Sequence, residues 1–234
     1  MQPDYSHIKV IGFDADDTLW VNETFFRDAE KAFGKLLSRF ETPNKIDQEL
    51  FKIEMQNLPL YGYGIKAFVL SMLEAALQIS NHKLQPSDLQ AILEIGKQMI
   101  SHPVKVLDGV TQTLKALEHR YRLILITKGD LLDQERKLKK SDLAHYFHHI
   151  EVVSEKNEEN YSGLLNQLNI KPSEFLMIGN SLKSDVLPLI NIKAHAVHVP
   201  FHTTWQHEVV VPDPEINYLT LNKISEIIPY LSQT

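Results

Sequence analysis

Residues 8–18 read Ile-Lys-Val-Ile-Gly-Phe-Asp-Ala-Asp-Asp-Thr, an apolar run that ends in a group of acids. The apolar part, residues 8–13, predicts a β-strand. Side chains alternate along a strand, so Asp14 and Asp16 start on the same side, at its carboxyl end. Ligands bind at that edge of open α/β sheets. The stretch therefore predicts a strand that delivers two carboxylates to a ligand-binding edge.

Further apolar runs along the chain predict four more strands, with amphipathic helical patterns between the later ones. The strands are expected at residues 123–126, 150–153, 175–178 and 194–199, and the helices at 109–119, 131–140, 160–169 and 184–191. Mostly continuous apolar runs are typical of strands buried on both faces of a parallel sheet. The alternation of strands and helices predicts an α/β fold, a doubly wound and mostly parallel sheet with a Rossmann-like core.

Residues 21–101 interrupt this rhythm. Apolar residues recur there at helical spacing, most clearly in residues 65–79, and Pro43, Pro59 and Pro86 are expected to divide the segment into several helices. The sequence thus predicts an all-helical cap domain of residues 21–101. It is inserted into an α/β core domain made of residues 1–20 and 102–234, with a closing helix near residues 223–231.

Composition excludes several classes of protein. The chain has 234 residues, of which 43% are hydrophobic, and a net charge of −6 with no basic stripe for nucleic acid. It contains no cysteine, which rules out a disulfide framework and a thiolate zinc site. No apolar stretch approaches the ~20 residues of a membrane helix, and the first residues lack secretory-signal features. We therefore expect a cytoplasmic protein with no membrane or nucleic-acid partner; these features do not predict its oligomeric state.

The first strand end offers two kinds of chemistry. The carboxylates of Asp14 and Asp16 could hold a hard cation such as Mg²⁺, which prefers oxygen ligands. They could also divide the roles of nucleophile and general acid. The alternative is an ordinary acidic turn after a strand.

The second strand runs into Thr127-Lys128-Gly129, where a hydroxyl and free backbone N–H groups could form a phosphate cradle. The alternative is a simple strand-to-helix turn. After the third strand, Lys156 could pair with the Asp14 carboxylate and a substrate phosphate oxygen, or it could be a solvated surface lysine.

The fourth strand leads to Gly-Asn-Ser-Leu-Lys-Ser-Asp at residues 179–185. Asp185 could supply a further cation ligand, and Asn180 could contribute through its carbonyl or a water. The alternative is that Ser184 or Asp185 only caps the next helix. Because four separate strand ends each carry one part of a phosphoryl-transfer site in order, we favour the functional interpretation.

These four motifs resemble those of the haloacid dehalogenase superfamily: DxDxT after an apolar strand, Thr127, Lys156, and GNSLKSD. They span residues 8–185, and the helical insert lies where members with a C1-type cap carry theirs. The resemblance implies Asp14 as nucleophile, Asp16 as general acid and base, and Lys156 as the charge-neutralising cation.

The resemblance also implies the binding groups. Phosphate would be bound by Thr127 with the amides of Lys128 and Gly129. Mg²⁺ would be held by Asp14, the backbone carbonyl of Asp16, and Asp185. The family often has Asp where this chain has Asn180, which makes Asn180 a further possible ligand with one negative charge fewer.

The implied function is a Mg²⁺-dependent phosphatase that hydrolyses a small soluble phosphate monoester through an aspartyl phosphate. True dehalogenases of the superfamily typically lack an Asp at the place of Asp16, whereas phosphatases and phosphomutases have it. A closing cap would exclude polymers, so the expected partner is a small phosphorylated metabolite. Two alternatives stay open: a phosphomutase or phosphotransferase on the same site, and a non-catalytic binding protein that kept the fold.

Overall fold

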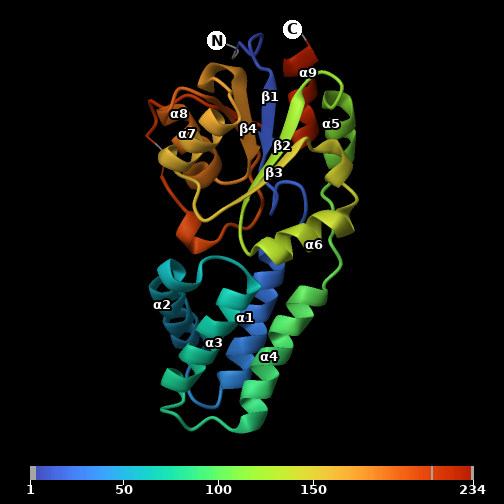
Figure 1. Ribbon diagram of the computed structural model, residues 1–234. Helices are drawn as coiled ribbons and strands as arrows, with labels where there is room; N and C mark the ends of the chain where they lie inside the picture. The colour runs from blue at the N-terminus through green and yellow to red at the C-terminus, as the bar shows by residue number, and fades with distance from the viewer. Residues whose placement is uncertain (1–3, 212, 233–234) are drawn as a thin grey trace. The chain divides into compact units, whose positions relative to one another are not determined.

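A parallel sheet forms the centre of one of the two units into which the chain divides (Figure 1). The computed structural model describes residues 4–211 and 213–232. The α/β unit contains the described residues up to Glu23, Val104–Lys128, and those from Lys137 onward. The helical unit contains Thr24–Pro103 and Gly129–Arg136. Helix α6 (Leu131–Ser141) is therefore shared between the two units.

The sheet has the strand order β3-β2-β1-β4-β5-β6, and all pairs are parallel. Its strands are β1 (Val10–Phe13), β2 (Arg122–Lys128), β3 (His149–Val153), β4 (Phe175–Gly179), β5 (His195–His198) and β6 (Leu219–Thr220). The predicted α/β class and its five strands are confirmed, with ends that differ by one or two residues. The short strand β6 was not predicted, because two residues are too few for an apolar run to be recognised.

Two helical layers cover the sheet (Figure 1). Helices α5 (Val110–Leu117) and α9 (Ile227–Ser232) share a core with Ile11 and Phe13 of β1. Helices α7 (Glu158–Gln167) and α8 (Leu187–Asn191) share the opposite core, which includes Val10. Alternate side chains of β1 thus enter different cores, as the pleat of a strand requires. This arrangement places β1 at the centre, with its carboxyl end between those of β2 and β4.

The segment after β4 corrects one prediction. Instead of one helix over residues 184–191, a wide π-helical turn at Leu182–Val186 precedes α8. Ser181 starts the turn, because its hydroxyl oxygen accepts from the Ser184 amide at 3.1 Å. Pro188 in the first turn of α8 has no N–H to donate backwards, so a regular helix cannot continue through it. The wide turn is where Asp185 lies.

The helical unit has its own apolar core. Its helices are α1 (Glu23–Leu37), α2 (Pro43–Tyr61), α3 (Ile65–Ile79) and α4 (Pro86–Ser101), together with the first part of α6. Pro43 and Pro86 begin helices, as predicted. Pro59 does not divide the segment: it lies in the last turn of α2, where a missing N–H removes a single helical hydrogen bond.

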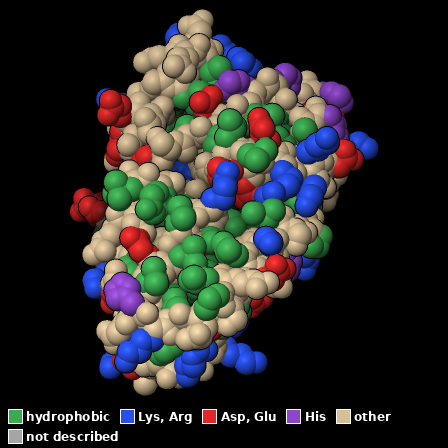
Figure 2. Space-filling model, turned by 60° about the horizontal axis from the view of Figure 1, so that its bottom comes forward, with side chains coloured by type: hydrophobic (Ala, Val, Ile, Leu, Met, Phe, Trp, Pro, Cys, Tyr) green, Lys and Arg blue, Asp and Glu red, His purple; other side chains and the backbone are tan. Residues whose placement is uncertain are grey.

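Several large apolar side chains of the helical unit stay exposed to solvent. They are Leu60, Tyr61, Leu70, Leu77, Leu93, Leu131 and Leu132. Figure 2 shows hydrophobic side chains gathered in patches on the face that it draws. Among the described residues, every helix is too short or too polar to cross a lipid bilayer.

The chain enters and leaves the helical unit at neighbouring points. Inside that unit, the rings of Phe25 and His102 stack with centroids 4.3 Å apart. Inside the α/β unit, the two connecting segments are paired, since the Val21 amide donates to the Lys105 carbonyl at 3.0 Å. The Leu107 amide donates to the Leu19 carbonyl at 2.9 Å. The insertion therefore begins and ends side by side.

Asp17 holds the start of α1, and its replacement tests this role. Its carboxylate accepts from the amides of Asn22 (2.8 Å) and Glu23 (2.9 and 3.1 Å), and its backbone is left-handed, with φ of 62°. Asp17→Ala should lower the free energy of unfolding by about 2 kcal/mol, through a lost cap and a strained φ. Asp17→Asn should keep most of the stability, because Asn accepts the same bonds and tolerates positive φ. Urea unfolding measures both; equal losses in the two variants would contradict the capping role.

Candidate active site

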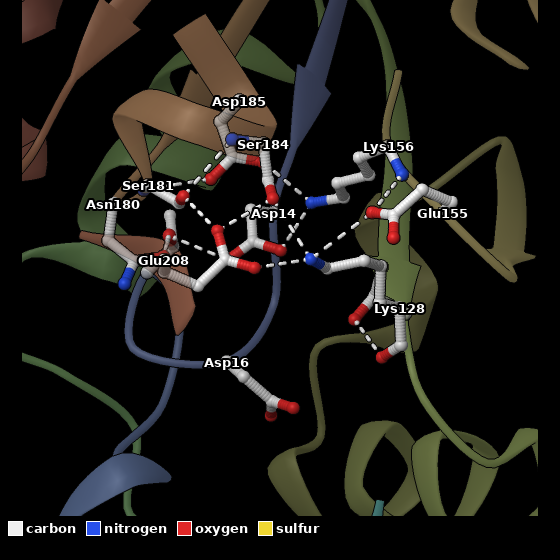
Figure 3. A network of polar contacts seen from close by, with 12 residues as sticks. Asp14, Asp16, Lys128, Glu155, Lys156, Asn180, Ser181, Ser184, Asp185 and Glu208 are labelled. Atoms are coloured by element: carbon white, nitrogen blue, oxygen red, sulfur yellow. Dashed lines mark hydrogen bonds and ion pairs between the residues drawn. The ribbon is translucent and has the colours of Figure 1, made fainter. Parts of the chain in front are cut away.

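A buried lysine joins the acids that follow β1 and β4 (Figure 3). Lys156 Nζ lies 2.5 Å from Asp14 Oδ1 and 2.7 Å from Asp185 Oδ1. Asp14 directly follows β1, Lys156 comes three residues after β3, and Asp185 lies in the turn after β4. All three are buried, so this lysine is not a solvated surface group. The parallel sheet brings together residues that are far apart in the sequence.

The charges of this group do not balance. Two carboxylates share one ammonium, and burial makes their joint ionisation costly. Burial raises the pKa of Asp14 to about 7, an effect that Asp185 and Asp16 reinforce and that Lys156 opposes. Burial alone would lower the pKa of Lys156, but Asp14 and Asp185 outweigh it and raise that pKa well above its ordinary value. The lysine thus stays charged. A second positive charge would balance the remaining carboxylate.

The turn after β4 is built for close approach to Asp185. A Cβ at Gly179 would lie 2.3 Å from the Asp185 carboxyl carbon, so only glycine fits there. The amide of Ser181 donates to Asp185 Oδ2 at 3.0 Å, and the Tyr161 hydroxyl donates to the Ser184 carbonyl at 3.0 Å. Asp185 is therefore held at both of its oxygens, by Ser181 and by Lys156.

Asn180 faces a group of oxygens beside Asp14. With the side-chain amide oriented to satisfy its neighbours, its nitrogen lies 3.1 Å from Asp14 Oδ2, 3.2 Å from the Asp16 carbonyl oxygen and 3.3 Å from Thr18 Oγ1. Thr18 itself donates to Asp14 Oδ2 at 3.0 Å. Without a cation, the amide NH₂ turned toward Asp14 and Asp16 satisfies these acceptors. With the amide oxygen turned toward Asp14 and Asp16 instead, only oxygen acceptors would face one another there. A cation would then be needed to hold them together.

This oxygen set fits Mg²⁺. Neighbouring ligands in an octahedral Mg²⁺ shell lie about 2.9 Å apart, since Mg–O distances are about 2.0–2.1 Å. The Asn180 amide lies 3.1 and 3.2 Å from the oxygens of Asp14 and Asp16, and it would join them as a ligand only with its oxygen turned toward them. Among the described residues, no three side chains of the types His, Asp and Glu form a metal cluster of their own. The candidate donors therefore include a backbone carbonyl and an amide as well as the carboxylates.

Asp16 does not join Asp14 through its side chain. Figure 3 shows its carboxylate turned away from Asp14. The Trp20 indole N–H donates to Asp16 Oδ1 at 2.7 Å, and Lys137 Nζ lies 2.6 and 2.8 Å from the two carboxylate oxygens. The buried Trp20 thus serves both the core and the site. Lys137 was not predicted, because nothing in the sequence separates it from the other lysines of α6.

The three residues of the predicted phosphate motif lie at the end of β2 and directly after it. Thr127 is buried at the end of β2, and its hydroxyl donates to the Lys128 carbonyl at 3.1 Å. The Lys128 ammonium turns to Ser184 Oγ (2.9 Å) and to the carboxylate of Glu208 (2.5 Å). Gly129 belongs to the helical unit. Its φ of 135° is a backbone conformation that favours glycine.

Sequence reasoning missed several residues around the site. Thr18 could have been found, since it ends the DxDxT motif that was already singled out. Ser181 lies inside the fourth motif, but only the folded turn reveals its role. Glu208 carried no signal, because it lies in an irregular segment beyond β5, away from every motif.

Comparison with known proteins places the chain in a family. The family model of haloacid dehalogenase-like hydrolases matches residues 8–192, which is most of the chain. The chain therefore belongs to the haloacid dehalogenase-like hydrolases, and the predicted resemblance is confirmed.

Individual relatives agree with this assignment. A crystal structure of a haloacid dehalogenase-like family hydrolase from Xanthomonas campestris has 36% identity and a TM-score of 0.87, covering 100% of this chain and 94% of the other. A glyceraldehyde 3-phosphate phosphatase from Pyrococcus furiosus is 26% identical over 79% of this chain and 78% of its own length. A second glyceraldehyde 3-phosphate phosphatase, from Methanothermobacter thermautotrophicus, is 23% identical over 94% of this chain and 98% of its own length.

Proposed function

We propose that this hydrolase is a Mg²⁺-dependent phosphatase that transfers the phosphoryl group of a small monoester to Asp14 and then to water. The observation that carries the proposal is the buried Asp14–Lys156–Asp185 group beside the oxygens of Asn180 and Asp16. A nucleophilic carboxylate, a fixed ammonium and a set of hard oxygen donors meet there. Phosphoryl transfer depends mainly on such positioning and charge stabilisation.

In the first half-reaction, a carboxylate oxygen of Asp14 attacks phosphorus in line. The bond between phosphorus and the leaving oxygen breaks, and Asp16 in its protonated form gives its proton to that oxygen. The products are an alcohol and an aspartyl phosphate on Asp14. For this step the Asp16 side chain must turn from Trp20 and Lys137 toward the leaving group.

In the second half-reaction, a water molecule attacks the aspartyl phosphate. Asp16, now ionised, takes a proton from the water, and the bond between phosphorus and the Asp14 oxygen breaks. This step releases inorganic phosphate and restores both carboxyl groups to their starting states.

Lys156 offsets the negative charge of the phosphoryl oxygens while it keeps Asp14 in place. The proposed Mg²⁺ ligands are Asp14, the backbone carbonyl of Asp16 and Asp185, with Asn180 as a further donor. When bound, the cation would neutralise charge on the phosphate and lower the repulsion between it and the Asp14 carboxylate. Thr127 and the amides of Lys128 and Gly129 are proposed to bind the remaining phosphate oxygens.

Asp16 favours phosphate esters over halogenated substrates. A halide leaves as a stable anion and needs no proton, whereas an alkoxide leaves readily only when it is protonated. An acid two residues beyond the nucleophile therefore suits an ester. The names of the two curated relatives support a triose phosphate as the first substrate to test.

We assign the helical unit as the substrate-specificity cap. Its larger part, Thr24–Pro103, is inserted between β1 and β2, and the unit has its own core, which suits a separate domain.

The test is phosphate release from para-nitrophenyl phosphate and glyceraldehyde 3-phosphate, with Mg²⁺ and with EDTA. We expect turnover only with the metal, restored when Mg²⁺ is added in excess of EDTA. Halide release from 2-chloropropionate serves as the comparison reaction. Metal-independent phosphate release, or halide release without phosphate release, would overturn the proposal.

A further inference from the structure

Glu208 reaches the site from a segment that belongs to none of the four motifs. It lies in the short 3₁₀ turn Gln206–Glu208, beyond β5, and only 12% of its side chain is exposed. One carboxylate oxygen lies 2.5 Å from Lys128 Nζ. The other accepts from Ser184 Oγ at 2.7 Å and from Ser181 Oγ. Figure 3 shows these contacts beside Asp14.

The surroundings of Glu208 favour a charged carboxylate. Burial alone would raise its pKa, but the Lys128 ammonium and the hydrogen bonds from Lys128, Ser181 and Ser184 outweigh burial and lower the pKa to about 2. Lys128 is equally enclosed, with 13% of its side chain exposed. A mostly buried pair of this kind loses much when one partner is removed, because the other charge is left uncompensated.

The donors to Glu208 belong to two different parts of the site. Lys128 ends β2, and its ammonium also donates to Ser184 Oγ at 2.9 Å. Ser181 and Ser184 belong to the turn after β4. Glu208 therefore bridges the end of β2 and this turn, which β1 separates in the sheet.

The same turn determines where Asp185 points. The Ser181 hydroxyl donates to Glu208 and accepts from the Ser184 amide at 3.1 Å, so the carboxylate fixes the orientation of that hydroxyl. The Ser181 amide in turn donates to Asp185 Oδ2. A second contact holds the segment in place, since Lys183 Nζ donates to the His207 carbonyl at 2.9 Å.

We infer that Glu208 is a positioning residue of the active site: by holding Lys128, Ser181 and Ser184 together, it fixes the turn that presents Asp185 to the metal. The inference rests on the proposed function, in which Asp185 is a Mg²⁺ ligand. It adds a residue from outside the four motifs to the machinery of the site.

The test compares Mg²⁺ binding by the full chain and three variants, measured by isothermal titration calorimetry without substrate. Glu208→Gln removes the charge and keeps the size, and Glu208→Ala removes both. Glu215→Gln is the matched control, because Glu215 is an exposed glutamate in the same part of the chain. Kinetics with para-nitrophenyl phosphate and thermal unfolding in EDTA are measured on the same samples.

Replacing a residue that orients a metal ligand typically weakens metal binding by about 10-fold or more. We therefore expect the Mg²⁺ Kd to rise by about 10-fold in Glu208→Gln and by more in Glu208→Ala. We also expect lower kcat at a fixed, subsaturating Mg²⁺ concentration, and no change in Glu215→Gln. A role in stability alone would lower Tm and leave the Mg²⁺ Kd within twofold of wild type, and that result overturns the inference. If Glu208→Ala does not fold, Glu208→Gln decides.

The wild-type protein separates this inference from the proposed function. Wild-type binding and turnover with unchanged Mg²⁺ affinity in the Glu208 variants would overturn the inference alone. Wild-type protein that neither binds Mg²⁺ nor releases phosphate would overturn both.

Discussion

Asp14→Asn should abolish phosphate release, lowering kcat by about 10⁴-fold or more, as the loss of a catalytic nucleophile does in other enzymes. A neutral amide oxygen is a poor nucleophile, and it cannot form the acyl phosphate that water later hydrolyses. The protein should still fold. Burial raises the pKa of Asp14 to about 7, so its charged form is costly in the fold; Asp185 still pairs with Lys156, and Asn keeps the shape of Asp.

The measurement is single-turnover and steady-state phosphate release, with mass spectrometry of quenched wild-type enzyme to detect a phosphorylated Asp14. Asp108→Asn provides the matched control, since Asp108 is exposed and lies outside the site. Retention of more than a tenth of wild-type activity by Asp14→Asn would contradict its role as nucleophile.

Lys156→Met should damage both activity and stability. Its ammonium is the shared partner of Asp14 and Asp185, so its removal leaves two carboxylates buried side by side. Removing one partner of a buried ion pair costs about 3–5 kcal/mol of stability. We expect the free energy of unfolding to fall by an amount in that range at pH 8 without Mg²⁺. The loss should shrink at pH 5, because burial raises the pKa of Asp14 to about 7 and this carboxyl group then takes up a proton. We expect kcat/KM to fall by about 10³-fold, as for removal of a main charge-stabilising donor.

Urea unfolding at pH 5 and pH 8, with and without Mg²⁺, measures the stability of this variant. Lys115→Met is the control, because Lys115 is an exposed lysine on α5. Mg²⁺ should recover part of the lost stability, since it supplies positive charge to the same carboxylates. A stability loss that grows toward pH 5 would show that Lys156 does not act as the counter-ion of these two acids.

The parts of the fold that could be predicted depend on local signals. Continuous apolar runs mark β1, β2 and β4 because these strands are buried on both faces. Once the sheet is parallel, the carboxyl ends of its strands must meet at one edge. That geometry is enough to predict that Asp14, Lys156 and Asp185 lie near one another.

The parts that could not be predicted depend on tertiary contacts between ordinary residues. Lys137 and Glu208 belong to residue types that are common on surfaces, and only the folded chain shows that one holds Asp16 and the other holds Lys128. Residues 184–186 of the turn at Leu182–Val186 were predicted as the start of a regular helix, because the hydrogen bonds of the turn involve Ser181 and its neighbours in a pattern without a periodic signature. Local sequence could therefore predict which candidate reacting groups lie near one another, but not which residues orient them.

The paired entry and exit of the helical insertion affect how the chain can fold. The central strand β1 is made first, but its two neighbours come much later, since Val10 pairs with Arg122 and with Phe175. Closing long loops costs conformational entropy and slows the formation of distant pairs. Helices α1–α4 rely on contacts closer in sequence, and their assembly brings Phe25 next to His102. Folding of the insertion would therefore shorten the loop that must close between β1 and β2, while Asp185 can reach Asp14 only when β4 pairs with β1.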